Sequence, residues 1–228
     1  MKFLRRMVEY MRELLFPCFC VTCNIEGSWW CESCRQIYHD DYAPACPGCA
    51  IFVGSGEPCV GCRPTSSLDR VSAQFRYSEF TAVGKLIRAF KYRYSMDIRK
   101  TWGAVLVFAP LESGGSTLIP VPLHGRRERE RGYNQAQIIC DVLSSRYGTA
   151  QSVGSLLRIR HTAQQAKLGR AGRLNNMKNA FEWRGGVVPE HVVLVDDVYT
   201  TGATMQECAR VLKAAGAKRV EGYVIARG

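Results

Sequence analysis

The sequence predicts an α/β protein in which helices flank a parallel sheet and a small cysteine-rich module comes first. Three observations carry this prediction. Strand-patterned and helix-patterned segments alternate after residue 65, which is typical of parallel strands joined by crossover helices. The strand predicted at 192–195 is apolar throughout, as expected when both faces of a sheet are covered. Four Cys-x-x-Cys pairs lie within the first 62 residues.

The chain begins with a predicted amphipathic helix at 1–16. Its apolar residues recur at helical spacing, and charged residues such as Arg5 and Glu9 interrupt them, so they do not form a signal-peptide core. No apolar run approaches the roughly 18 residues that span a bilayer. We expect this helix to dock on the protein's own core, with a membrane surface as the alternative. We also expect a cytoplasmic protein without a transmembrane segment.

The eight cysteines of residues 17–64 are predicted to hold two structural zinc ions, because two knuckles complete one tetrahedral shell. Short spacers favour pairing of consecutive knuckles, with a cross-braced arrangement as the alternative. The expected ligands are Cys20, Cys23, Cys31 and Cys34 for one zinc, and Cys46, Cys49, Cys59 and Cys62 for the other. Cys18 stands close enough in sequence to replace one ligand. A disulfide framework fits poorly with a chain that has no predicted export signal.

The net charge favours anionic partners. The formal value is +11, and two zinc ions with four thiolates each would lower it to about +7. Phosphorylated metabolites and nucleic acids are the partners that such a balance attracts. Few apolar residues are available in the cysteine module, so metal would supply its folding energy. Trp29, Trp30 and Arg35 would also allow the module to contact nucleic acid or a protein.

A turn-rich stretch places a domain boundary near Pro64, so that the second domain covers 65–228. The elements predicted in it are a strand at 71–77, a helix at 82–92, a strand at 118–123, a helix at 132–143, the strand at 192–195, a helix at 203–214 and a strand at 220–226. Cys140 and Cys208 fall in apolar helical surroundings and are expected to be buried packing residues.

The most informative stretch is 192–204, VVLVDDVYTTGAT, in which a buried strand ends in two carboxylates and a threonine-rich turn. A turn at a helix start favours an anion, because backbone N–H groups and the helix dipole point at it. Gly202 permits close approach of the anion. Asp196 and Asp197 suit the hydroxyl groups of a sugar beside that phosphate. The alternative is an ordinary strand, turn and helix with a polar cap.

Two further segments are basic. Arg126, Arg127, Arg129 and Arg131 would clamp a diphosphate through forked hydrogen bonds. Glutamates alternate with these arginines, so a solvated helix face is the alternative. Residues 158–173 are basic and rich in small residues, which fits either a lid over an anion or an exposed loop.

Residues 192–204 resemble the phosphoribosyl-pyrophosphate (PRPP) signature of type I phosphoribosyltransferases. Nearly the whole chain resembles the ComF family, phosphoribosyltransferase-like proteins associated with natural competence and DNA uptake. The resemblance includes Phe-Pro before the cysteine knuckles, Phe90-Lys91-Tyr92, and Pro-Val-Pro-Leu-His before Arg126. It continues through Arg131-Gly-Tyr-Asn-Gln and through His161-Thr-Ala-Gln-Gln, which precedes Arg173 and Asn176.

This resemblance implies a type I phosphoribosyltransferase-like sheet and a role for each matching residue. Asp196 and Asp197 would hold the ribose hydroxyls of PRPP at the catalytic centre, with Mg²⁺. The residues around the 5′-phosphate would be Val198, Thr200, Thr201, Gly202, Ala203 and Thr204. The residues around the pyrophosphate would be Arg126, Arg131, Gly132, Asn134 and Gln135. The lid would contain Gln165, Arg173 and Asn176. Two departures bear on turnover rather than binding. The chain has no Pro-Asp-Ser-Gly pyrophosphate loop, and Ala163 replaces the proline usual after the lid threonine.

Three functions follow as hypotheses. The first is a PRPP-binding competence protein that handles incoming single-stranded DNA, with proteins of the competence machinery as partners. The second is an active phosphoribosyltransferase that displaces pyrophosphate from C1 of PRPP with a nitrogenous base or an amine. The third is a regulator that senses PRPP and contacts a partner through its zinc module.

Overall fold

The structure is a computed structural model that describes residues 17–38, 44–92, 97–106, 115–160 and 176–228, together with the single residues 7, 11 and 172. The helix predicted at 1–16 falls, except for two residues, outside the described part of the chain. The domain limits at 16 and 64 stay predictions. Among the described residues, none of the helices has the length and apolar character needed to cross a membrane.

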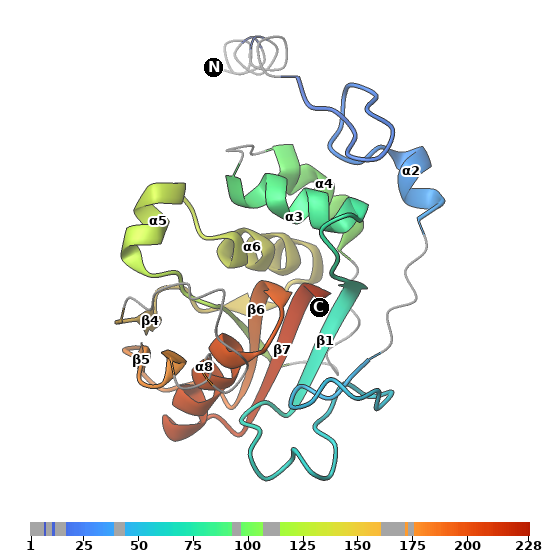
Figure 1. The fold of residues 1–228 in the computed structure, drawn as a ribbon. Helices are drawn as coiled ribbons and strands as arrows, with labels where there is room; N and C mark the ends of the chain where they lie inside the picture. Colours follow the sequence, from blue (N-terminus) through green and yellow to red (C-terminus); the bar gives the residue numbers. More distant parts are fainter. Residues whose placement is uncertain are drawn as a thin grey trace.

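Five parallel strands form the central sheet in the order β1-β7-β6-β2-β3 (Figure 1). The strands are β1 (Arg70–Arg76), β2 (Thr117–Pro120), β3 (Ala150–Gln151), β6 (His191–Tyr199) and β7 (Arg219–Arg227). The pairing of Pro120 with Val195 shows that β2 ends beside Val195, before β6 itself ends at Tyr199. The two segments that follow these strands, the basic one and the threonine-rich turn, therefore start from one edge of the sheet.

Helices cover both faces of this sheet (Figure 1). One face carries α3 (Ala82–Tyr92), α4 (Asp97–Val105) and α6 (Gln135–Tyr147), and the other carries α8 (Ala203–Ala214). Val193 and Val195 of β6 pack into the core with the first three helices, whereas Val192 and Leu194 pack into the core with α8. The alternation explains why this strand is apolar throughout, and the predicted parallel sheet flanked by helices is confirmed.

The strands and helices predicted at 71–77, 82–92, 203–214 and 220–226 correspond to β1, α3, α8 and β7, and Cys140 and Cys208 are fully buried as expected. The helix predicted at 132–143 is wrong in its start. Residues 125–147 form two helices, α5 (Gly125–Arg131) and α6. Gly132 ends α5 with a left-handed φ of 78°, and Asn134 caps α6 by accepting a hydrogen bond from the N–H of Ala136 at 3.0 Å.

The strand predicted at 118–123 is shorter than expected. β2 ends at Pro120, and Val121 adds one hydrogen bond from its N–H to the carbonyl of Val195 at 2.9 Å. Pro122 follows and has no N–H to donate, so the ladder stops there. The chain then turns away from the sheet toward α5.

A two-stranded antiparallel hairpin lies outside the main sheet and was not predicted. It pairs β4 (Leu156–Arg158) with β5 (Phe181–Trp183) and flanks the segment expected to form the lid. The guanidinium of Arg160 donates to the carbonyls of Asn176 and Lys178 at 2.8 and 2.7 Å. The N–H of Asn179 donates to Glu207 of α8 at 2.8 Å. These bonds anchor both ends of the segment.

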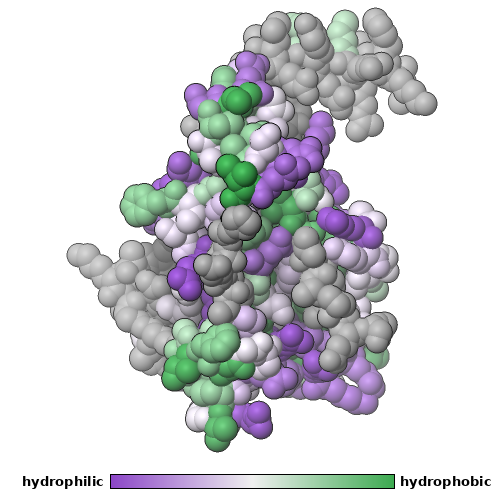
Figure 2. All heavy atoms as spheres, turned by 90° about the vertical axis from the view of Figure 1, so that its right-hand side faces the viewer, coloured by the Kyte–Doolittle hydropathy of each residue, from purple (hydrophilic) through white to green (hydrophobic). Residues whose placement is uncertain are grey.

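The two cysteine-rich segments contact different parts of the molecule. The first contains α2 (Glu32–Gln36) and packs on the α3 side, where Trp30 and Cys34 join the core and Lys85 donates to the carbonyl of Val21 at 3.3 Å. The second lies beside α8, because Gly48 and Cys62 line one cavity together with Ala203 and Gln206 of α8. Just after this segment, the N–H of Ser67 donates to Gln206 at 2.8 Å. Figure 2 shows the side of the molecule at the right of Figure 1, where hydrophobic and hydrophilic side chains both occur in small patches.

Candidate functional site

Asp196 and Asp197 both lie within β6, which extends to Tyr199 rather than ending at Val195. Asp197 is 6% exposed, and its Oδ2 lies 3.0 Å from Nζ of Lys91, near the end of α3. Oδ1 of Asp196 accepts a hydrogen bond from the N–H of Asp197 at 2.8 Å. The two acids therefore stand at the boundary between the sheet and the layer of helices, with a lysine bound to one of them.

The electrostatics of this cluster favour a cation. Burial and the neighbouring Asp197 carboxylate raise the pKa of Asp196 to about 7. Burial opposes the charge of Lys91, but Asp197 and Asp196 outweigh it and raise the pKa of the ammonium group. One ammonium group thus has to compensate the charge of two carboxyl groups. A divalent cation near them would restore the charge balance and let both ionise, and carboxylate oxygens are the ligands that Mg²⁺ prefers.

The turn after β6 has the features of an anion site. Gly202 caps α8 with a φ of 75°, and α8 has no side-chain cap. Within the described part of the chain, the N–H groups of Thr201, Gly202, Ala203 and Thr204 donate to no other backbone group. These are donors that a helix start leaves for a ligand, and the helix dipole adds a favourable field.

The basic segment after β2 lies on the exposed helix α5. Nε of Arg126 lies 2.9 Å from a carboxylate oxygen of Glu130, and the two side chains are 70% and 59% exposed. This geometry matches the solvated helix face that was the alternative reading. Arg131 donates to the side-chain oxygen of Gln135 at 3.1 Å. Contacts of these arginines with a diphosphate stay a prediction.

The junction between α5 and α6 is tied to both β2 and α3. Asn134 donates to the carbonyl of Val121 at 3.0 Å, and the hydroxyl of Tyr133 donates to the carbonyl of Phe90. Gln135 is 2% exposed. A cavity of about 520 Å³ lies against this junction and the end of β2, with Leu157 and Arg158 of β4 in its wall. Tyr133 and Asn134 thus line this cavity, whereas Gly132 and Gln135 are not among its lining residues.

Sequence reasoning missed Lys91 and Tyr133 as site residues. Both occur in segments that carried the family resemblance, but only the residues around them received roles. Their signal in the sequence was weak, because Lys91 fits the polar face of a helix and Tyr133 a turn. Of the three residues assigned to the lid, Asn176 is held by Arg160, whereas Gln165 and Arg173 lie outside the described residues.

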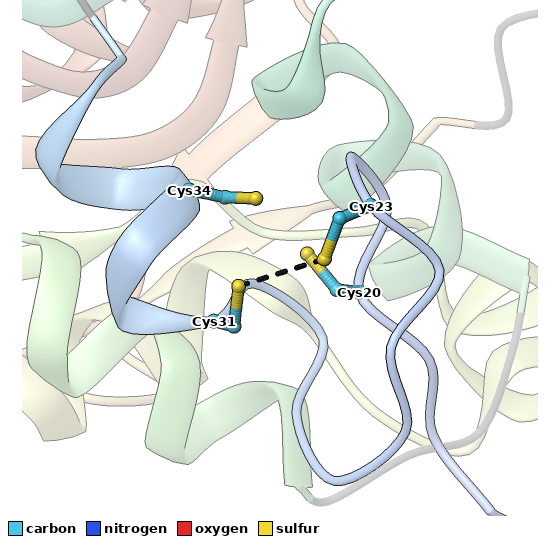
Figure 3. Close-up of side chains that lie close together, drawn as sticks. All are labelled: Cys20, Cys23, Cys31 and Cys34. Atoms are coloured by element: carbon cyan, nitrogen blue, oxygen red, sulfur yellow. Dashed lines mark hydrogen bonds between the residues drawn. The ribbon is translucent and has the colours of Figure 1, made fainter.

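The first cysteine cluster consists of Cys20, Cys23, Cys31 and Cys34, whose side chains point toward one another (Figure 3). All four Sγ atoms lie within 4.8 Å of one another, and those of Cys23 and Cys31 are 3.7 Å apart. Zn–S bonds of about 2.3 Å in a tetrahedron place sulfurs about 3.8 Å apart, so the residues fit zinc. Cys18 does not belong to this cluster.

The second cluster consists of Cys46, Cys49, Cys59 and Cys62. The Sγ atoms of Cys49 and Cys59 are 3.7 Å apart, and Sγ of Cys46 accepts the N–H groups of Gly48 and Cys59 at 3.2 and 3.3 Å. Burial opposes ionisation of Cys46, but these N–H groups and that of Cys49 lower its pKa to about 6.

The neighbouring sulfurs of Cys59 and Cys49 raise the pKa of Cys62 to about 12. The four thiols of the second cluster therefore need a cation to ionise together. None of the eleven cysteines, all of which the structure describes, forms a disulfide bond. The pairing of consecutive knuckles is confirmed, and either cluster could hold a structural zinc ion.

Comparison with known proteins places the turn inside a known domain. A family model described as phosphoribosyl transferase domain matches residues 139–228, which include β6, the turn and α8. The chain is 31% identical to the DNA utilization protein YhgH of Salmonella typhi, over 94% of this chain and 99% of that protein.

Two relatives carry the word competence in their names. Competence protein F of Haemophilus influenzae is 28% identical, over 86% of this chain and 96% of that protein. Competence protein ComFC of Streptococcus pneumoniae is 23% identical, over 89% of each. Both matches extend over more than four fifths of this chain.

Proposed function

The chain belongs to the ComF family of phosphoribosyltransferase-like proteins, and from this premise we propose that it binds PRPP with Mg²⁺ and serves DNA uptake by handling single-stranded DNA in the cytoplasm. One observation carries the proposal. Two acids and a turn with free amide groups lie together at the carboxyl end of β6. Ligands of open parallel sheets bind at such strand ends.

Each part of PRPP has a matching group in this arrangement. The turn of residues 200–204 would receive the 5′-phosphate at the start of α8. Asp196 and Asp197 would hold the ribose hydroxyls and Mg²⁺. Lys91, which lies 3.0 Å from Asp197, would add a positive charge to attract the diphosphate. Mg²⁺ would neutralise the phosphate oxygens, which is the chemistry that it supplies when bound.

Calorimetric titration of PRPP in the presence of Mg²⁺ tests the binding site. We expect the double variant Asp196→Asn/Asp197→Asn to bind at least about tenfold more weakly than wild type, because it loses the charges that attract Mg²⁺. Glu182→Gln/Glu190→Gln, which removes two exposed acids, is the matched control and should bind like wild type. Equal affinity of wild type and the aspartate double variant would refute the site.

The role with DNA is supported by charge and by the names of the relatives. The positive net charge of the chain attracts nucleic acid, and the exposed helix α5 carries Arg126 and Arg129. We expect binding of a single-stranded oligonucleotide to weaken steeply as salt rises, because bound phosphates release counter-ions. Arg126→Gln/Arg129→Gln should reduce the slope of log K against log salt. Weak binding that does not change with salt would remove the DNA role.

An active phosphoribosyltransferase is the rival function, and the phosphoribosyl transferase domain match favours it. The reaction would release pyrophosphate from PRPP with a nitrogenous base or an amine as acceptor. Pyrophosphate release that depends on one acceptor would establish it. If the protein binds PRPP but turns over none of a broad panel of acceptors, two functions remain. One is the binding function proposed above, and the other is a sensor that reports PRPP to a partner protein of the competence machinery. A pull-down with and without PRPP would distinguish them.

A further inference from the structure

Arg227, near the end of β7, is a buried cation whose identified partners are all neutral. It is 5% exposed. Its Nη1 and Nη2 each lie 2.5 Å from a carbonyl oxygen, those of Ala45 and Cys46, and its Cζ lies 4.9 Å from the centre of the Tyr199 ring. No carboxylate of the described residues forms an ion pair with it. Burial of a charge is unfavourable, so negative charge close to this guanidinium stabilises it.

The second cysteine cluster supplies that charge when it holds zinc. Cys46 is a member of the cluster, and its own carbonyl accepts a hydrogen bond from Arg227. Zinc bound by four thiolates carries a net charge of −2. A filled cluster would therefore more than compensate the single positive charge of the guanidinium, and the same metal would order the knuckle that Arg227 contacts.

Tyr199 connects this knuckle to the phosphate-binding turn. Its hydroxyl donates to the carbonyl of Pro47 at 2.8 Å, and Pro47 lies between the cluster members Cys46 and Cys49. The same hydroxyl lies against Gly202, where an added Cβ would come within 2.0 Å of it. Tyr199 and Arg227 are register partners of β6 and β7. Knuckle, strand ends and turn thus form one continuous set of contacts.

We propose that the second cluster is a positioning element of the phosphate-binding turn: zinc there sets the conformation of residues 200–204 through Arg227 and Tyr199. The inference rests on the proposed function, because its ligand is the 5′-phosphate end of PRPP. Coupling between two sites is reciprocal. Bound PRPP should therefore raise the affinity of the second cluster for zinc, and bound zinc should raise the affinity of the turn for PRPP.

The two clusters offer a matched pair of variants. Cys49→Ser and Cys23→Ser each remove an exposed cysteine from one cluster. We expect Cys49→Ser to bind PRPP with Mg²⁺ about tenfold more weakly, because the turn loses its support. Cys23→Ser should stay within about twofold of wild type, because the first cluster contacts the α3 side instead. Calorimetry gives the affinity, elemental analysis the zinc content, and circular dichroism the folded state.

Two further variants keep all eight ligands. Tyr199→Phe removes only the hydroxyl that contacts Pro47, and Arg227→Met removes the buried charge. Both should weaken PRPP binding. Tyr223→Phe removes a hydroxyl that donates to Gln74 at 3.3 Å, away from the knuckle, and should leave the affinity unchanged. If Cys49→Ser fails to fold, the PRPP affinity of Tyr199→Phe decides whether the inference holds, because this variant deletes only one oxygen atom from an otherwise complete protein.

The outcomes separate this inference from the proposed function. Wild type that binds PRPP, with Tyr199→Phe and Arg227→Met equal to it, overturns the positioning role and leaves the function standing. If wild type binds no PRPP, the proposed function is wrong. The rate at which a chelator removes zinc then tests the inference by itself. In the Cys23→Ser background, where only the second cluster is complete, Arg227→Met should lose its zinc to a chelator several-fold faster. Equal release rates would overturn the inference.

Discussion

Two carboxyl groups and one ammonium group meet at the end of β6, so the charges of Asp196, Asp197 and Lys91 do not balance. Lys91 binds Asp197 at 3.0 Å, and the proximity of Asp197 then acts with burial to keep a proton on Asp196. A protonated Asp196 is a poor ligand for a cation, and an ionised one is a good ligand. Binding of Mg²⁺ is therefore linked to loss of this proton.

The raised pKa of Asp196 predicts how stability changes with pH. The pKa is about 7 in the folded protein against the ordinary value of 3.8 for this group, so between these values the folded state holds a proton that the unfolded chain releases. Stability then falls as pH rises through this window. We expect Asp196→Asn to be more stable than wild type at pH 8, by at most about 4 kcal/mol, and to show a smaller difference at pH 4.

Urea unfolding of Asp196→Asn at pH 4 and pH 8 measures this effect as the difference from wild type. Glu190→Gln is the control, because Glu190 is an exposed acid paired with Lys218. The same pH dependence in wild type and Asp196→Asn would show that this carboxyl group does not titrate in the window.

Lys91 should matter more for stability than a lysine with a shorter ion pair on the surface. Lys91→Ala leaves Asp197, which is 6% exposed, without its cation, and we expect a loss of about 2–3 kcal/mol in the free energy of unfolding. Lys218→Ala breaks a pair of 2.6 Å whose side chains are 72% and 73% exposed, and should cost under about 1 kcal/mol. Equal losses in the two variants would contradict the assignment of Lys91 to a buried pair.

Elements with a strong periodic pattern were predictable from the sequence, and elements defined by tertiary contacts were not. α3 and α8 lie at the predicted residues, because each has a buried face that fixes the spacing of its apolar positions. The break between α5 and α6 was missed, since the positive φ of Gly132 interrupts a pattern that otherwise continues. β4 and β5 have three residues each and are paired across a long segment, so neither has a recognisable period.

The candidate site was predictable to a similar degree. The acid pair, the turn and both cysteine clusters follow from local spacing, which the sequence displays directly. Lys91 and the contacts of Tyr199 with Pro47 depend on segments that meet only after folding. Arg126 shows the opposite case, because a sequence rich in arginine does not say whether the side chain faces a ligand or a glutamate.

The turn after β6 should tolerate no side chain at Gly202. Gly202→Ala would place a methyl group 2.0 Å from the Tyr199 hydroxyl, which is itself held by Pro47. We expect a loss of about 2–4 kcal/mol from the left-handed backbone and overpacking together. Gly148→Ala is the control, with a φ of 66° and nothing within 4 Å of the added atom, and should cost about 1 kcal/mol from the left-handed backbone alone. Thermal or urea unfolding compares them, and similar losses would mean that Tyr199 moves aside readily.

At the scale of the whole molecule, the cysteine-rich segments are part of the packing of the domain. The first joins the core on the α3 side through Trp30 and Cys34, and the second is bound to α8 and to the ends of β6 and β7. Metal bound in either cluster binds the folded state in preference to the unfolded one, so it stabilises the domain as well as its own loops.

Metal removal should therefore be visible in the tryptophan emission. Trp29 and Trp30 are 8% and 3% exposed beside the first cluster, whereas Trp102 is fully buried between the sheet and its helices. We expect a strong chelator to shift the emission to longer wavelength and to lower Tm by several degrees, because the first segment loses the metal that orders it while the sheet keeps its core. Trp30→Phe should show a smaller shift at the same loss of zinc. A chelated protein with unchanged emission and Tm would mean that packing alone orders this segment, since Trp30 would then keep its environment without the metal.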